Sequence, residues 1–384
     1  MSVIDVASKW REDEELTALA DSVRRFFARE APPERLAKWR EDGIVEREMW
    51  RKAGAAGMLC ASIPEAYGGA GGDFRHECVI MQETPPNSGF GIGLHNTIVA
   101  PYILHYGSEA QKQAWLPLMA TGDLVGAIAM TEPGAGSDLQ GVKSTARRDG
   151  GHYVLNGQKT FITNGQTANL IIVVAKTDAS QGARGVSLIA VETDKVEGFR
   201  RGRNLDKLGM EAQDTSELFF DDVRVPIENL LGAAEGQGFV QLMQQLPQER
   251  LQIAVQGCVA MERALELTAA YVHERKAFGK SISEFQNTQF KLAECKTQAT
   301  VARVFVDRCI ELLLAGELDA ATASMAKYWV SDTQGQVIDE CLQLHGGYGY
   351  MKEYEITRLY ADARVQRIYG GTNEIMKVLI ARTI

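Results

Sequence analysis

The sequence predicts an α+β fold with three consecutive domains: an N-terminal all-α domain, a middle antiparallel β domain and a C-terminal α domain that resembles a four-helix bundle. Three observations predict this order. Apolar residues recur at helical spacing up to about residue 120, short strand-like runs separated by turn residues follow to about residue 232, and long helical runs return after about residue 237. We therefore place the domains at residues 1–120, 121–232 and 233–384.

The N-terminal region carries two helix signals. Leu19, Val23, Phe26 and Phe27 recur at the spacing of one helix face. The run Ser108–Gln111 matches a capping box, in which a serine and the residue three places later satisfy free N–H groups at the start of a helix. Both signals predict helices, the second beginning near residue 109.

The middle region reads as short strands joined by tight turns. The strand-like runs Tyr153–Leu155 and Lys159–Ile162 flank Asn156-Gly157, which predicts a hairpin with a type I′ turn. Further strands are expected at residues 170–174, 186–191 and 217–220. Strands that follow one another this closely indicate an antiparallel sheet and not alternating βαβ units.

The C-terminal region is expected to be helical, because apolar residues keep helical spacing over residues 259–276, 283–314 and 322–344. Pro247 lies ahead of these runs on a segment that is also helical in pattern. A proline inside a helix lacks the N–H that the preceding turn needs, so we expect it to disturb the helix and free a backbone carbonyl.

The composition is that of an ordinary soluble globular protein, with 45% hydrophobic and 24% charged residues. A formal net charge of -9 argues against a nucleic-acid or anionic-membrane partner, since these need clustered positive charge. No apolar run approaches the roughly 20 residues of a membrane span, and the first residues hold no secretion signal. The six cysteines are widely spaced and form no metal or redox motif. We expect a cytoplasmic protein with reduced thiols and no bound metal.

Several common catalytic motifs are missing. There is no GxGxxG, no HExxH and no GxSxG, which disfavours a Rossmann nucleotide site, a zinc protease and an α/β-hydrolase. Phe278–Ser281 resembles the end of a P-loop, but Glu274 stands where that loop needs glycine.

Four glycine-rich or hydroxyl-rich segments suggest backbone that approaches a ligand. Ala129–Asp138 places glycines beside Thr and Ser hydroxyls, and Phe161–Gly165 ends a strand with a turn; each alone also fits an ordinary surface turn. Gln343–Tyr350 closes a helix with three glycines, although a helix C-cap needs one. Arg367–Ile375 is a glycine break before a Thr/Asn pair that can cap the next helix and face an anion.

Glu249 is a candidate general base. On a helix, Leu242, Leu246, Glu249 and Ile253 share one face. A carboxylate on an apolar stripe is unfavourable unless it is paired, and burial raises its pKa toward the range useful for a base. A buried ion pair with the neighbouring Arg250 explains the pattern equally well, so both interpretations stand.

Taken together, the segments resemble the acyl-CoA dehydrogenase family. Thr131–Asp138 resembles the first signature of that family, and Gln343–Asp362 resembles the second. Glu274–Gly279 with Phe285-Gln286, and the turn Gly370–Glu374, match the same family. The four segments lie in the family's order across essentially the whole chain, and the family has the same α–β–α organisation.

The resemblance implies non-covalently bound FAD. Within one subunit it implies flavin contacts from Met130, Thr131, Phe161, Ile162, Thr163, Thr372, Asn373 and Glu374. It implies that the FAD of a neighbouring subunit is reached by Arg275, Gln286, Gln343, Leu344, His345, Gly346 and Gly347. The family is usually a homotetramer, so a homo-oligomer is implied. The glycine excess then has a reason, because glycine backbone can lie against a dinucleotide without Cβ atoms.

The resemblance also implies an acyl-CoA substrate, with binding residues at Ser137, Val240, Arg250, Gly370 and Gly371. Most family members carry the catalytic Glu directly after the Tyr of the last motif, where this chain has Gly370. The long-chain and isovaleryl-type branches instead place the base on an internal helix as Glu-Arg-Leu, which Glu249-Arg250-Leu251 matches. The surrounding runs look most like the long-chain type.

The activity implied is α,β-dehydrogenation of a medium-chain, long-chain or branched acyl-CoA to a trans-2-enoyl-CoA. Glu249 would remove the α-proton, and a hydride would pass from the β-carbon to N5 of FAD. The N–H of Gly370, with a flavin hydroxyl, would stabilise the developing charge on the thioester oxygen. Electrons would then pass to an electron-transfer flavoprotein. Two alternatives stay open: a non-catalytic acyl-CoA-binding flavoprotein, suggested by Gly370, and an acyl-CoA oxidase.

Overall fold

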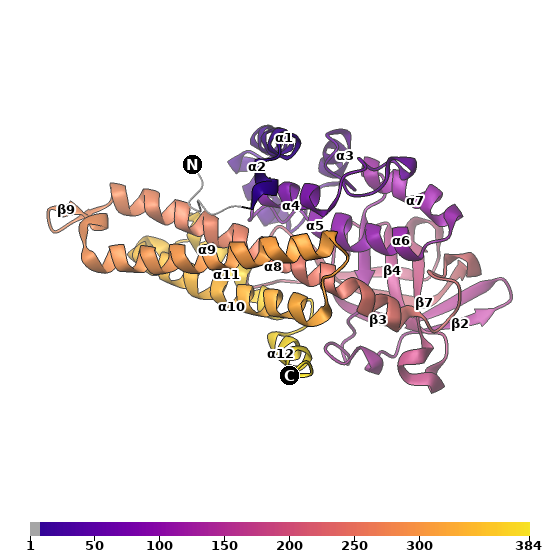
Figure 1. Ribbon diagram of the computed structural model, residues 1–384. Coiled ribbons are helices and arrows are strands. Elements are labelled where there is room, and N and C mark those ends of the chain that lie inside the picture. The colour runs from indigo at the N-terminus through magenta and orange to yellow at the C-terminus, as the bar shows by residue number, and fades with distance from the viewer. Residues whose placement is uncertain (1–7) are drawn as a thin grey trace.

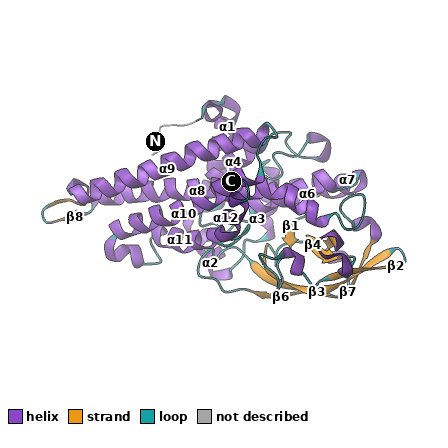
Figure 2. Ribbon diagram, turned by 60° about the horizontal axis from the view of Figure 1, so that its bottom comes forward, coloured by secondary structure: helices purple, strands orange, loops and turns teal. Residues whose placement is uncertain are grey.

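The computed structural model describes residues 8–384, so the first seven residues, on which the expectation of no secretion signal partly rests, lie outside it. Figure 1 shows an elongated molecule in which the long C-terminal helices form one end. The β sheet forms the other end, covered on one side by N-terminal helices, and the rotated view in Figure 2 shows the same arrangement. The predicted α+β fold class is confirmed.

The N-terminal domain is helical. Its helices are α1 (Glu14–Glu30), α2 (Pro33–Asp42), α3 (Arg47–Ala55), α4 (Phe74–Glu83), α5 (Ile92–Leu94), α6 (Ala100–Tyr106) and α7 (Glu109–Thr121). Val23, Phe26 and Phe27 form the buried face of α1, as predicted. The predicted capping box at the start of α7 is also present, because Ser108 and Gln111 each bond the backbone of the other. A π-helix, His95–Val99, leads directly into α6.

The middle domain is built on one sheet. Its strands are β1 (Gly126–Ala129), β2 (Thr145–Asp149), β3 (His152–Thr163), β4 (Leu170–Lys176), β5 (Val186–Glu192), β6 (Phe199–Asn204) and β7 (Thr215–Pro226). They lie in the order β1–β4–β2–β3–β7–β6, and β5 also pairs with β4. The pairing is antiparallel except for β1 with β4 and a short contact of β2 with β4, which are parallel.

The predicted hairpin turn at Asn156-Gly157 is wrong. β3 continues through these residues, and the chain reverses at Gly150-Gly151, where Asp149 of β2 pairs with His152 of β3. Asn156-Gly157 instead marks a bulge, where the pairing of β3 with β7 shifts register. A Cβ at Gly157 would lie 2.1 Å from the Ser144 hydroxyl oxygen. Glycine is therefore required here for close packing at a bulge and not for a turn.

The C-terminal domain is a bundle of long helices. They are α8 (Gly238–Glu274), α9 (Gln286–Leu314), α10 (Ala320–Leu344), α11 (Glu355–Ala363) and α12 (Asn373–Ala381), and a small hairpin of β8 (Lys276–Ala277) and β9 (Lys280–Ser281) joins α8 to α9. Pro247 does not break α8, which continues across it, although the missing N–H of the proline still leaves one carbonyl of the preceding turn without its usual donor. Leu246 and Leu251 are buried on either side, and their packing outweighs the missing N–H.

Candidate active site

Glu249 lies inside the protein where α8 meets α6. Its side chain is 5% exposed, and Leu242, Leu246 and Ile253 of the same helix face are also buried, as the helical pattern predicted. The hydroxyl of Tyr102 donates a hydrogen bond to Oε1 of Glu249 at 2.8 Å. Burial raises the pKa of Glu249 to about 7, although the Tyr102 hydrogen bond and the charge of Arg250 oppose the rise. The carboxyl group therefore has the pKa that a general base needs near neutral pH.

The alternative interpretation, a buried ion pair between Glu249 and Arg250, is not observed. The Arg250 guanidinium instead donates to the Ser324 hydroxyl at 3.3 Å. Its Nε is buried and has no hydrogen-bond partner in the part of the chain that the structure describes. Burial lowers the pKa of Arg250, and the nearby charge of Glu249 raises it. An unpaired buried donor of this kind has capacity for a polar or anionic ligand group.

Gly370 lies against the same face of α8. A Cβ at this position would be 2.4 Å from Cδ1 of Ile253, which is one helical turn beyond Glu249. Gly370 has a φ of +64°, in the left-handed region that favours glycine. Its N–H makes no hydrogen bond with any residue in 8–384, so a donor is available beside Glu249. The structure thus brings together the candidate base Glu249 and the Gly370 turn, which the sequence separates by more than 100 positions.

Lys327 of α10 holds the turn that contains Gly370 and Gly371 in place. Its side chain is fully buried, and its Nζ donates to the carbonyl oxygen of Gly371 at 2.7 Å and to Oδ1 of Asn373 at 2.9 Å. Burial lowers the pKa of Lys327 to about 8. The Asn373 amide also donates to α10, at Ser331 and Asp332. Both the oxygen and the nitrogen of the Asn373 side-chain amide therefore have hydrogen-bond partners within the protein. Thr372 caps α12, and Glu374 is exposed.

We expect Gly370→Ala to destabilise the FAD-loaded protein by about 1–3 kcal/mol, because the new Cβ meets Ile253 and an alanine is strained at this φ. Adding Ile253→Val should restore part of the loss by removing the atom that collides. Urea unfolding measures both effects. Gly316→Ala is the matched control, since Gly316 has a φ of +71° but no atom within 4 Å of its Cβ position. Equal losses at the two glycines would contradict the predicted contact.

Two of the segments predicted to contact FAD within one subunit meet at two strand ends, whereas the third, Thr372–Glu374, lies at the start of α12. Met130 and Thr131 follow β1, and Phe161–Thr163 closes β3. The backbone N–H of Thr160 donates to the carbonyl of Thr131 at 2.9 Å, which holds the two segments side by side. Phe161 is 67% exposed, so its ring is available to a planar ligand. Ser137 lies exposed in the loop after Thr131, and Val240 is half exposed on the first turn of α8.

The buried side chain of Lys159 joins the end of β1 to β3 through hydrogen bonds. It is fully buried in β3, and its Nζ donates to the carbonyl oxygen of Met130 at 3.1 Å, to that of Val174 at 2.6 Å and to Oε1 of Glu132 at 2.9 Å. Burial lowers the pKa of Lys159 to about 8, against the attraction of Glu132. Sequence reasoning missed Lys159, Lys327 and Tyr102, because their partners lie on other elements and no local pattern marks them.

The second predicted FAD set lies elsewhere in the molecule. Arg275 and the segment 344–347 line a cavity of about 500 Å³ with Tyr271 and Tyr348, and Gln286 begins α9 nearby. Gly346 and Gly347 have no atom within 4 Å of a Cβ position, so their backbone is open to a ligand. This cavity is at the end of α8 next to the β8–β9 hairpin, whereas β3 is at the opposite end of the molecule (Figures 1 and 2). The two sets cannot enclose the same ligand within one chain.

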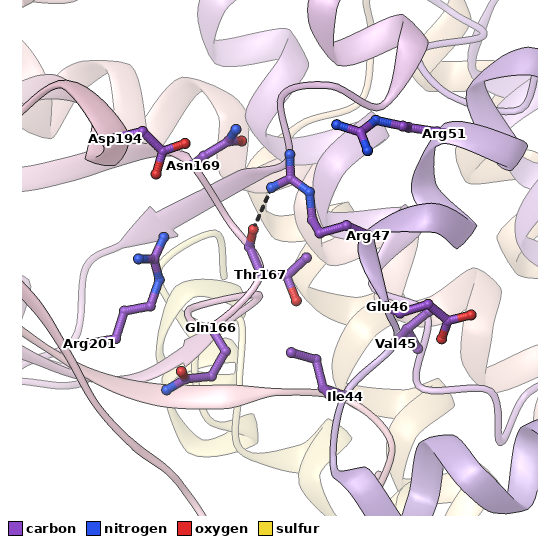
Figure 3. Close-up of a pocket in the computed structure, with 10 residues that line it drawn as sticks. All are labelled: Ile44, Val45, Glu46, Arg47, Arg51, Gln166, Thr167, Asn169, Asp194 and Arg201. Atoms are coloured by element: carbon purple, nitrogen blue, oxygen red, sulfur yellow. Dashed lines mark hydrogen bonds between the residues drawn. The ribbon is translucent and has the colours of Figure 1, made fainter.

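A second cavity, of about 450 Å³, lies between α3 and the loop after β3 (Figure 3). Arginines line it, and all three are bonded to the protein. Arg51 donates to the Asp123 carboxylate at 2.9 Å, and Arg47 and Arg201 donate mainly to backbone carbonyls. Arg47 donates to the carbonyls of Thr167 and Asp123 at 2.8 and 2.7 Å, and Arg201 donates to two carbonyls of the same loop. These bonds fasten the loop that leaves the Phe161–Thr163 strand end. The arginines therefore have a structural role, and we assign this cavity no ligand.

Comparisons with known proteins agree with this architecture. Family models described as the N-terminal, middle and C-terminal domains of acyl-CoA dehydrogenase match residues 13–123, 127–223 and 236–384. The chain is 53% identical to a mitochondrial long-chain specific acyl-CoA dehydrogenase of Sus scrofa, over 95% of this chain and 85% of that protein. The chain belongs to the acyl-CoA dehydrogenase family and is an oxidoreductase.

Two solved structures are similar along the whole chain. A crystal structure of an acyl-CoA dehydrogenase from Geobacillus kaustophilus has a TM-score of 0.94 and 51% identity, covering 97% of this chain and 98% of that one. A structure of an acyl-CoA dehydrogenase complexed with FAD from Bacillus anthracis has a TM-score of 0.91 and 33% identity, covering 100% of this chain and 69% of that one. The predicted family and cofactor are confirmed.

The residues present fit FAD. The exposed Phe161 ring at the end of β3 offers a surface for the flavin ring system, and the turn beside it offers backbone groups and the Thr131 hydroxyl. The glycine-lined cavity offers the Arg275 guanidinium, which suits a phosphate. By contrast, residues 8–384 contain no group of three His, Cys, Asp or Glu side chains that could hold a metal ion, and no helix long and apolar enough to cross a membrane.

Proposed function

We propose that this acyl-CoA dehydrogenase oxidises long-chain acyl-CoA thioesters to trans-2-enoyl-CoA, with Glu249 as the base that removes the α-proton. The observation that carries the proposal is a buried carboxyl group with a pKa of about 7, next to a turn whose glycine N–H is unpaired. The similarity to a long-chain specific relative supports the long-chain substrate.

The chain's own residues supply binding, orientation and proton transfer. Glu249, ionised in part at neutral pH, takes the α-proton onto a carboxylate oxygen. The Gly370 N–H donates to the thioester oxygen, where negative charge develops as the proton leaves. An acyl chain packed on the apolar face of α8 excludes water from Glu249 and so strengthens both interactions. FAD, when bound, accepts the two electrons and the hydrogen from the β-carbon.

The separation of the two predicted FAD sets supports an oligomer. Met130, Thr131 and Phe161 would hold the flavin of their own subunit, and the cavity with Arg275 would receive part of the FAD of another copy. We propose a homotetramer, as in the family. Light scattering of the FAD-loaded protein measures the mass of the assembly and so tests this proposal. The proposed electron acceptor is an electron-transfer flavoprotein, and the six free, buried cysteines support a reducing, cytoplasmic location.

Anaerobic mixing of the FAD-loaded enzyme with straight, branched and aromatic acyl-CoAs tests the substrate. We expect the flavin absorbance to bleach fastest with long straight chains. Faster bleaching by short or branched chains would overturn the long-chain proposal. Failure to bleach with every acyl-CoA would favour the non-catalytic alternative, and hydrogen peroxide released during turnover in air would favour an oxidase.

A further inference from the structure

We propose that Tyr102 is a positioning residue for the reaction: its hydroxyl holds one oxygen of the Glu249 carboxylate so that the other oxygen is directed to the substrate. The proposal rests on the proposed function, because it assumes that Glu249 is the base. Tyr102 touches neither substrate nor cofactor in this scheme and acts through Glu249.

The two carboxylate oxygens of Glu249 have different surroundings. Oε1 accepts the Tyr102 hydrogen bond at 2.8 Å. Oε2 makes no hydrogen bond with the described residues. It is not completely buried either, so a ligand can reach it. Tyr102 is completely buried, and its hydroxyl has Glu249 as its hydrogen-bond partner within residues 8–384. The contact therefore satisfies a buried hydroxyl and leaves one carboxylate oxygen for the proton.

The segment before Tyr102 is fixed to α8 on both sides of Glu249. Thr97 belongs to the π-helix that leads into α6, and its hydroxyl donates to Oε1 of Gln252 at 2.7 Å. The Gln248 amide donates to the backbone carbonyl of Thr97 at 2.8 Å. Positions 248 and 252 flank Glu249, so these bonds fix α6 relative to the base. A π-helix is rare and often marks a functional site, which fits this arrangement.

The hydrogen bond also affects when Glu249 is ionised. The titratable and charged groups that face Glu249 are Tyr102 and, one turn later, Tyr106 of α6, together with Arg250 of its own helix. Burial holds the pKa of Tyr102 well above its ordinary value, so its hydroxyl stays a donor at neutral pH. A donor to a carboxylate favours the ionised form, so loss of the hydroxyl raises the pKa of Glu249.

The test is Tyr102→Phe in the FAD-loaded enzyme, with the pH profile of kcat/KM as the readout. We expect the acid limb, near pH 7 in the parent enzyme, to move up by roughly one pH unit, because one neutral hydrogen bond has about that effect on a pKa. Below the limb the rate should fall about tenfold, since it follows the ionised fraction of Glu249. A smaller loss of kcat at high pH, with KM little changed, reports the positioning itself.

Tyr106→Phe is the matched control. Tyr106 lies one turn along the same helix. Its hydroxyl donates to Gln244 and Gln241 and accepts a hydrogen bond from the Gln245 amide, but makes none with Glu249. We expect this variant to keep the acid limb of the parent. A second variant, with 3-fluorotyrosine at position 102, keeps the side-chain shape and makes a stronger donor, so it should move the limb to lower pH even where Tyr102→Phe folds poorly.

The outcomes separate this inference from the function on which it rests. Reduction of FAD at the parent rate by Glu249→Gln would overturn the proposed base. An inactive Glu249→Gln together with an unmoved acid limb in both position-102 variants would overturn only the role of Tyr102. An equal shift in Tyr106→Phe would also overturn it, because the effect would then be a general one of the helix.

Discussion

Glu249→Gln is expected to lower the rate of flavin reduction by acyl-CoA by about 100-fold to 10,000-fold, the range that a general base contributes. The amide keeps the size of the side chain and can still accept the Tyr102 hydrogen bond, so the fold should survive. It cannot take the α-proton. FAD content and acyl-CoA binding should stay near those of the parent enzyme, and anaerobic stopped-flow absorbance of the flavin measures the loss.

Two exposed carboxylates in the C-terminal domain provide the controls. Glu374 lies in the first turn of α12, and Glu353 lies just before α11. Both side chains are exposed to solvent, so neither lies in a site from which a bound acyl chain would exclude water. Glu374→Gln and Glu353→Gln should therefore reduce FAD at close to the parent rate. A fast Glu249→Gln combined with a slow variant at either position would move the base there.

The position of Glu249 could be predicted from sequence because it depends on helix geometry alone. Residues at i, i+4, i+7 and i+11 share a face in any α-helix, and three of the four here are apolar. The start of α7 could be predicted for the same reason, since a capping box joins residues only three positions apart. Local rules of this kind gave the order of helices and strands.

The wrong predictions concern residues whose local preference loses to tertiary packing. Asn156-Gly157 favours a turn, yet β3 continues there because both its neighbours in the sheet pair with it. Pro247 disfavours a helix, yet α8 continues because its buried side chains hold it in the bundle. The hydrogen bond between Tyr102 and Glu249 could not be predicted from the sequence either, since the two residues are 147 positions apart in the chain. Only the fold brings such residues together.

Lys159→Met is expected to destabilise the protein by about 3–5 kcal/mol, the usual loss when one member of a buried ion pair is removed. The Glu132 carboxylate would keep its bonds from the backbone N–H groups of Lys143 and Ser144 but lose its cation. The carbonyls of Met130 and Val174 would lose a donor. The turn after β1 would then be held less firmly, so we expect FAD to be lost as well.

Urea unfolding and the FAD content of the purified protein measure these two effects. Arg203→Met is the control, because Arg203 pairs with Glu217 on the surface and is 78% exposed, where an ion pair contributes at most about 1 kcal/mol. Adding Glu132→Gln to Lys159→Met should recover part of the lost stability, since the unpaired buried charge is removed. FAD binding should stay weak in the double variant, because the carbonyl of Met130 still lacks its donor. A Lys159→Met protein as stable as the Arg203→Met control would show that the buried pair does not hold the two strand ends together.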